Sequence, residues 1–330
     1  MPPPPIPGVP NLAGNDAAER EKNRKATSLK ITWGEVTPVD SYQIQIKVGT
    51  NTTLVDANAP PTLLQNRPDN SKHVIRVRAK KGTQFSNFSD AFSVFTRPKT
   101  PDPPRLVGTL ATDDDPLADV TARDANSLQL TWPSVGTGIT YDLDFGGGDV
   151  RNGVSPDDTF DKLEPNKLYN VRVRARDDVR GGVSDFSSPL RKIRTRPPVP
   201  TGLRRLGIDL FFQMMQFHWD SVSAFPGSTP AKWQLGLRVA GTNTDPQIQA
   251  TGGLGITSFL ESHYPLGTQQ EYLIRIVAGT NQQNQSFWSP ALLVNGPVVN
   301  LLGIQRTLNV IPDVGAAVPS LLDQSDPFRL

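Results

Sequence analysis

The sequence predicts an all-β protein in which one module occurs three times. Each copy has a strand ending in tryptophan, then a strand whose apolar residues take every second position, then a Ser-x-Phe/Trp-Ser motif. A period of two is typical of a strand with one buried and one solvent-facing side. The tryptophans are Trp33, Trp132 and Trp219; the alternating strands are His73–Ala79, Tyr169–Ala175 and Tyr272–Ala278; the motifs are Ser86–Ser89, Ser184–Ser187 and Ser286–Ser289.

In this order the three features resemble the fibronectin type III family, over about residues 7–297. The resemblance implies three tandem fibronectin type III-like (immunoglobulin-like) β-sandwiches, each with seven strands in two sheets, and no enzymatic activity. It indicates little about a ligand, because the family serves adhesion, scaffolding and spacing alike. We expect modules at 12–98, 99–197 and a divergent third at 198–297, with extended arms at 1–11 and 298–330.

Length and composition agree with this division. A chain of 330 residues fits three modules of about 100 residues each. The 27 glycines and 31 prolines suit many turns, and the absence of cysteine excludes disulfides and thiolate metal sites. A formal net charge of +2 does not direct the protein toward nucleic acid or an anionic membrane.

The N-terminus lacks the features of a secretory signal peptide, and no apolar run is long enough to cross a membrane. We therefore expect a protein made without a recognisable leader, or one whose leader was removed. Virion proteins and surface assemblies built from this module fit that expectation by family resemblance. If the protein belongs to neither, it is cytoplasmic.

The N-terminal arm should be extended or polyproline II, because five of residues 1–7 are proline. It is either a solvated tail or an arm lying on a neighbour, and in the second case Ile6 and Val9 would contact the partner. The polar insertion Ala17–Lys25 has no apolar stripe, so we expect a solvated loop rather than a helix. At Ser184–Ser187 we expect a further strand to begin.

The boundaries between modules are proline-dense. Arg97–Pro104 and Arg196–Pro200 should act as semi-rigid spacers between modules. Between the first strand of the second module and Trp132 lies a cluster of carboxylates that could bind Ca²⁺ through oxygen ligands. The sequence lacks a Ca²⁺-loop motif, and clustered aspartate is common in solvated turns. The candidate ligands are Asp113, Asp114, Asp115 and Asp119.

The third module and the C-terminal arm carry the main candidates for partner binding. Leu210–Phe217 is apolar on both strand faces, so one face should enter the core and the other should contact a partner or be covered by the chain. The segment 298–330 is too apolar for a disordered tail and too short to form its own core. The candidate residues are Met214, Met215, Leu301, Leu302, Ile304, Leu308, Val310, Ile311, Val314, Val318, Leu321, Leu322 and Phe328.

No residue pattern indicates catalysis or a cofactor. No Gly-x-Ser-x-Gly, His-Glu-x-x-His or Walker-type motif occurs. Outward arginines form basic ladders in the first two modules, whereas Val277 aligns with Arg78 and Arg174 in the third. The ladders have no interleaved aromatics, and acidic residues lie near them. They are therefore better explained as solvated strand faces or salt-bridged subunit contacts than as a nucleic-acid site.

Two functional hypotheses follow. The first is a non-catalytic building block of a large assembly, a rod of three sandwiches whose arms bind other copies or other subunits. A phage virion component is the leading setting and a bacterial surface filament the next. The second hypothesis is a carbohydrate-binding or adhesion array, which needs an exposed aromatic platform such as Trp233 or Trp288.

Overall fold

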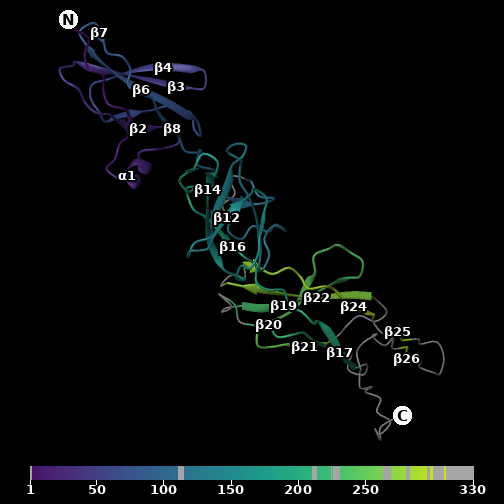
Figure 1. The fold of residues 1–330 in the computed structure, drawn as a ribbon. Helices are drawn as coiled ribbons and strands as arrows, with labels where there is room; N and C mark the ends of the chain where they lie inside the picture. The colour runs from purple at the N-terminus through teal and green to yellow at the C-terminus, as the bar shows by residue number, and fades with distance from the viewer. Residues whose placement is uncertain are drawn as a thin grey trace. The chain divides into compact units, whose positions relative to one another are not determined.

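The computed structural model (Figure 1) confirms the all-β class. In the described residues, strands are accompanied by a single helix of six residues, α1 (Ala17–Lys22). Tertiary contacts group the chain into unit 1 (Met1–Arg105, Leu130–Asp158, Asn170–Lys192) and unit 2 (Leu106–Gln129, Thr159–Tyr169, Ile193–Leu330). The structure describes residues 2–110, 115–209, 214–223, 225, 231–262, 269–279, 283–295, 298–299 and 308–309.

The first module has two antiparallel sheets. The smaller contains, in spatial order, β1 (Asn11–Leu12), β2 (Leu29–Thr32) and β5 (Thr62–Leu64). The larger contains β4 (Asn51–Ala57), β3 (Ser41–Val48), β6 (Lys72–Lys81) and β7 (Gln84–Phe85), and β8 (Phe92–Phe95) also pairs with β6. Burial alternates along β3 and β6, as the sequence pattern predicts.

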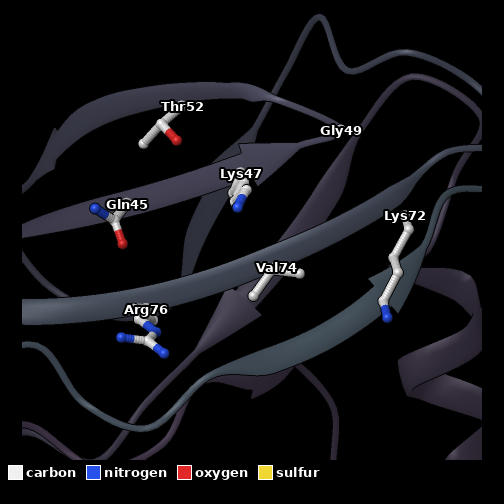
Figure 2. A pocket seen from close by; sticks show the side chains of 7 residues that line it. All are labelled: Gln45, Lys47, Gly49, Thr52, Lys72, Val74 and Arg76. Carbon is white, nitrogen blue, oxygen red and sulfur yellow. The ribbon is translucent and has the colours of Figure 1, made fainter.

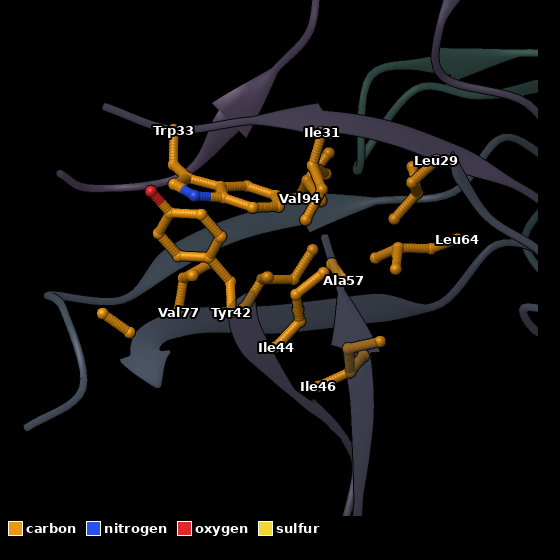
Figure 3. Packing of buried hydrophobic residues seen from close by; sticks show 12 residues of the cluster. Leu29, Ile31, Trp33, Tyr42, Ile44, Ile46, Ala57, Leu64, Val77 and Val94 are labelled. Atoms are coloured by element: carbon orange, nitrogen blue, oxygen red, sulfur yellow. The ribbon is translucent and has the colours of Figure 1, made fainter. Parts of the chain in front are cut away.

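The core of this module is formed by the inward residues of both sheets (Figure 3). Ile44 and Ile75 are completely buried, and burial of such a side chain stabilises the fold by about 1.5–3 kcal/mol. Trp33 meets Tyr42 edge-on, with ring centroids 5.3 Å apart. The Tyr42 hydroxyl accepts the Val36 N–H at 3.1 Å and donates to the Val36 carbonyl at 3.2 Å, so its polar end is satisfied.

The second module repeats the arrangement. One sheet contains β13 (Thr159–Phe160), β10 (Leu128–Thr131) and β9 (Arg105–Leu106). The other contains β12 (Val150–Val154), β11 (Thr140–Asp144), β14 (Leu168–Asp177) and β15 (Gly182–Val183), and β16 (Arg191–Arg194) pairs with β14. Trp132 and Tyr141 repeat the edge-on pair, with centroids 5.4 Å apart.

The third module has the same pair of sheets. One contains β17 (Arg204–Asp209), β18 (Met214–His218) and β21 (Ser258–Ser262). The other contains β20 (Gln247–Gly253), β19 (Ala231–Val239), β22 (Gln269–Ala278) and β23 (Asn284–Gln285), and β24 (Leu292–Asn295) pairs with β22. Its core includes Phe217, Trp219 and Trp233. The three pairs of sheets confirm the predicted tandem β-sandwiches.

The last strand of each module is divided into two pieces, and this corrects the sequence prediction. Ser184–Ser187 is not a strand but separates β15 from β16. The Ser184 hydroxyl accepts the Ala175 N–H at 2.9 Å, and the Ser187 hydroxyl accepts the Val173 N–H at 3.0 Å. The serines therefore satisfy backbone donors of β14 that a continuous strand would otherwise satisfy.

The same serine contacts correct the alignment of the third module. The Ser286 hydroxyl accepts the Ile276 N–H at 2.9 Å, as the Ser86 hydroxyl accepts the Ala79 N–H. Ile276 is thus the counterpart of Ala79, and Arg275 the counterpart of Arg78. The prediction that Val277 replaces Arg78 and Arg174 was wrong by two residues, because it aligned the aromatic residues at the strand starts.

The insertion before β2 is a helix and not a loop. Asp16 caps α1, since its side chain accepts the Glu19 N–H at 2.8 Å. No residue of α1 is buried, as the absence of an apolar stripe in the sequence predicts. A helix of about one and a half turns nevertheless forms, because its N-terminus is capped.

Candidate module junctions and interaction surfaces

Two arginines of the first module hold a turn of the second module within unit 1. Arg24 Nη2 donates to the Gly181 carbonyl at 3.0 Å, and Arg97 Nη1 lies 3.2 Å from Asp185 Oδ1. Glu21 joins both arginines, at 2.8 Å from Arg24 Nη2 and 3.1 Å from Arg97 Nε. Both guanidinium groups are largely buried, whereas the carboxylates of Glu21 and Asp185 remain partly exposed, so solvent screens these ion pairs in part.

Gly182 permits the close approach at this junction. A Cβ atom at this position would lie 3.1 Å from Pro98 Cδ and 3.9 Å from Arg97 Cα. Nearby, burial would raise the pKa of Asp177, but hydrogen bonds from the Arg180 backbone and the Asn70 side chain hold that pKa below its ordinary value. Because Asn70 belongs to the first module, the Asp177 carboxylate also connects the two modules.

A second junction in unit 2 is centred on Arg123, whose side chain is buried. Arg123 Nε donates to the Ala118 carbonyl at 2.8 Å, and Nη2 donates to the Leu117 carbonyl at 2.9 Å. Its Nη1 donates to Asn284 Oδ1 of the third module at 2.6 Å. Burial, together with the nearby positive charge of Arg196, lowers the pKa of Arg123 to about 10.

Asn284 and Arg196 complete this junction. Asn284 Nδ2 donates to Asn166 Oδ1 at 2.6 Å and to the Thr195 carbonyl at 2.8 Å. Arg196 Nη1 donates to the Gln285 carbonyl at 3.0 Å, and the guanidinium lies 4.0 Å from the centre of the Phe287 ring. The third module is therefore attached by buried, satisfied polar groups, which fix geometry more strictly than apolar contacts do.

The two junctions use the same positions of successive modules. Arg24 and Arg123 are 99 residues apart (123 − 24), and so are Arg97 and Arg196 (196 − 97). Glu21 supplies the acid in one junction and Asp119 in the other. The sequence prediction noted the proline-rich linkers but missed the arginines. Their recurrence at the same spacing was the available signal.

The N-terminal arm lies on its own first module. Every third residue is buried, at Pro4, Pro7 and Pro10, which matches the three residues per turn of polyproline II. The Gly8 N–H donates to the Gly34 carbonyl at 3.1 Å, next to the β1–β2 pairing. Ile6 and Val9 face away and are 52% and 53% exposed. The arm therefore docks in cis and leaves two aliphatic side chains about half exposed.

The other predicted partner residues fall into three groups: one is buried in the core, two lie at described strand positions, and the rest lie outside the described residues. Met215 is 1% exposed and belongs to the third core, so it is not available as a contact; Met214 is half-buried. Leu308 lies in β26 (Leu308–Asn309), which pairs with β25 (Val298–Val299). The remaining candidates lie outside the described residues: Leu301, Leu302, Ile304, Val310, Ile311, Val314, Val318, Leu321, Leu322 and Phe328.

Neither candidate tryptophan forms an exposed platform. Trp233 is 3% exposed and packs against Trp219, with ring centroids 4.8 Å apart. Trp288 is half-buried, and the Arg275 guanidinium lies 4.3 Å from the centre of its ring. Arg78 over Phe88 and Arg174 over Phe186 repeat this stacking, so the aromatic of the Ser-x-Phe/Trp-Ser motif packs on an arginine.

The two described carboxylates of the predicted Ca²⁺ cluster, Asp115 and Asp119, have different hydrogen-bond partners. Asp119 accepts a hydrogen bond from Arg196, which holds the pKa of Asp119 below its ordinary value. Asp115 accepts the Leu117 N–H at 2.9 Å, and Asp113 and Asp114 lie outside the described residues. Among described residues, no group of three or more histidine, aspartate or glutamate side chains could hold a metal ion.

The structure also bears on the expectation that the chain does not cross a membrane. Over the ranges that the structure describes, no helix has the length and apolar character needed to cross a bilayer.

These observations define the class: the chain has the fibronectin type III fold, repeated in tandem. Solved structures similar to it include the chicken CNTN1 FN1–FN3 domains (15% identity, covering 89% of this chain and 99% of that chain, TM-score 0.26). A two-domain fibronectin type III segment of chicken tenascin has 16% identity, covers 57% of this chain and 99% of that chain, and has a TM-score of 0.34. The central fibronectin III array of RIM-binding protein has 18% identity, covers 89% and 97%, and has a TM-score of 0.25.

At these identities and TM-scores the comparisons say nothing of function, and the fold assignment rests on the sheet order described above. No protein-family model matches the chain, and no curated protein matches its sequence.

Proposed function

We propose that this chain is a non-catalytic structural protein of a large assembly, in which the modules act as spaced beads and the terminal arms bind neighbouring subunits. A virion component, such as a phage tail, capsid decoration or fibre protein, is the setting we favour, and a bacterial surface filament is the next. Binding would combine burial of apolar arm residues with strand addition at sandwich edges.

The observation that carries the proposal is the N-terminal arm. Its prolines attach it to the first module, while Ile6 and Val9 remain about half exposed. An arm that is already ordered loses little conformational entropy when its aliphatic side chains enter a partner. The apolar sequence of 298–330 supports the same role for the other end of the chain.

Sedimentation velocity over a range of concentrations tests this proposal. We expect the full chain to form oligomers or filaments. Ile6→Asp with Val9→Asp should weaken association at least tenfold, because each change places a charge in the contact. Deletion of 298–330 should also reduce assembly. Leu110→Asp, at another exposed aliphatic residue, is the matched control and should assemble as the full chain does.

A full chain that stays monomeric at every concentration contradicts the proposal. Equal assembly of all variants would remove the arms from the mechanism. The alternative of a carbohydrate-binding or adhesion array has no specific observation in its favour, since Trp233 and Trp288 pack within their module.

A further inference from the structure

A hollow of about 640 Å³ lies on the outer face of the larger sheet of the first module (Figure 2). Strands β3, β4 and β6 form it, together with the β3–β4 turn at Gly49. Three of its residues are cationic and none is acidic. The lining residues are Gln45, Lys47, Gly49, Thr52, Lys72, Val74 and Arg76.

Strand register places the three cations around one apolar residue. Lys47 is the cross-strand partner of Val74, and Gln45 is the partner of Arg76. Lys72, Val74 and Arg76 are alternate residues of β6, so they share one face. Lys72 and Arg76 are four positions apart along β6, which places their Cα atoms about 13 Å apart.

The cationic side chains of this hollow face solvent. In the described residues, Lys47, Lys72 and Arg76 have no ion-pair partner, and all three are exposed. Like charges held on adjacent strands repel one another, and an anion placed between them would relieve that repulsion.

The second module provides an internal comparison, because the equivalent ladder there is neutralised. Arg172 takes the position of Arg76, and Asp144 takes the position of Gln45. Arg172 Nη2 lies 2.8 Å from Asp144 Oδ2, and Asp142 accepts from Arg174 at 2.9 Å and from Arg176 at 2.6 Å. One side-chain difference, Gln45 for Asp144, therefore leaves Arg76 available to an external carboxylate.

The chemistry of the lining favours a peptide over a polysaccharide or nucleic acid. The lining has no aromatic ring on which a sugar or base could stack. Val74 is instead accompanied on the same face by Leu54, the cross-strand partner of Gln45, which is 52% exposed. Aliphatic side chains between cations suit the methylene groups and carboxylates of glutamate or aspartate.

We propose that this hollow binds an extended acidic segment of a partner protein, with carboxylates at alternate positions. In an extended segment, residues i, i+2 and i+4 lie on one face and span about 13 Å. They would meet Lys72, Lys47 beside Val74, and Arg76 in turn. This site is separate from the arms of the proposed function and does not depend on it.

Fluorescence anisotropy tests the inference with the full chain and a labelled peptide, Gly-Thr-Glu-Thr-Glu-Thr-Glu-Thr-Gly. We expect saturable binding that weakens with salt, and at least tenfold weaker binding of the peptide in which glutamine replaces glutamate. Gln45→Asp is the decisive variant, because it adds the carboxylate found in the second module and removes no cation. It should weaken binding at least tenfold, as should Arg76→Gln.

Lys192→Gln, at an exposed lysine of the second module, is the charge-matched control and should bind within twofold of the unchanged protein. Circular dichroism verifies that each variant is folded. Equal binding of the two peptides, or no effect of Gln45→Asp, overturns the proposal. Binding of heparin or inorganic phosphate at this hollow without binding of the peptide also overturns it.

Discussion

The same residue type has opposite roles in this chain, and the neighbouring atoms decide which role it takes. Arg123 is buried and donates to carbonyls and to Asn284, so it is part of a junction. Arg76 is exposed on a sheet face, in a hollow whose described lining residues include no carboxylate. A buried guanidinium stabilises the fold only while all its partners remain, since each lost partner leaves a desolvated polar group.

We predict that Arg123→Ala lowers the free energy of unfolding by about 2–4 kcal/mol, because the Ala118 and Leu117 carbonyls and Asn284 Oδ1 lose their donor. Urea denaturation measures the change. Lys192→Ala removes an exposed charge from the same module and should change stability by less than about 0.5 kcal/mol. Equal stability of the two variants would contradict a stabilising role for the hydrogen bonds of Arg123.

At the scale of strands, sequence periodicity identifies the elements. Contacts across the sheet decide where each strand ends and which of its charged side chains form ion pairs. The alternation along β6 and β14 appears directly in the burial of these strands. The division of the last strand into β15 and β16 was not predictable, because it depends on two serine hydroxyls that reach back to β14. Helix α1 was missed for a similar reason, since one capping side chain stabilises it without any apolar face.

The ion pairs between β11 and β14 should make the second module sensitive to acid. Burial alone would raise the pKa of Asp142, but hydrogen bonds from Arg176 and Arg174 outweigh it and hold that pKa below its ordinary value. A carboxyl whose pKa is lower in the folded state contributes stability above its unfolded pKa. That stability is lost as the pH falls from about 4 through the folded pKa.

We therefore predict that Asp142→Asn destabilises the protein at pH 7 and that the difference from the unchanged protein shrinks as the pH falls below about 4. Thermal unfolding monitored by circular dichroism at pH 7, 4 and 2 measures it. The comparison at pH 2, well below the ordinary pKa of an aspartate, is the reference, because the charge of Asp142 contributes least to stability there. A difference that stays constant with pH would mean that the Asp142 charge contributes no stability.

At the scale of the whole molecule, repetition extends beyond the modules to the contacts that join them. Arg24 and Arg97 contact residues that flank β15 of the second module, and Arg123 and Arg196 contact β23 of the third module, each pair within its own unit. The third module has Pro297 three residues after Val294, where Arg97 follows Val94 and Arg196 follows Ile193. The arginine pair therefore does not recur in full at the end of the array.

The Gly182 contact provides a test of the first junction. We predict that Gly182→Val opens it, because even a Cβ atom would lie 3.1 Å from Pro98 Cδ. The linker after Arg97 should then be cleaved several-fold faster by trypsin at Lys99 or Arg105, since local opening exposes the backbone. Gly253→Val, where a Cβ atom meets nothing within 4 Å, is the control. Unchanged cleavage in both variants would contradict the close packing at Gly182.

The sequence alone determined the all-β class, the three modules and the apolar character of both arms. These properties follow from local periodicity and composition, which depend on neighbouring residues. Only the tertiary structure decided which arginines are neutralised, that Met215 and Trp233 are buried, and that the N-terminal arm docks in cis. Those outcomes depend on partners such as Asp142 and Arg176, which are 34 residues apart and meet through the register of β11 and β14. A one-residue shift of that register would point these side chains to opposite faces.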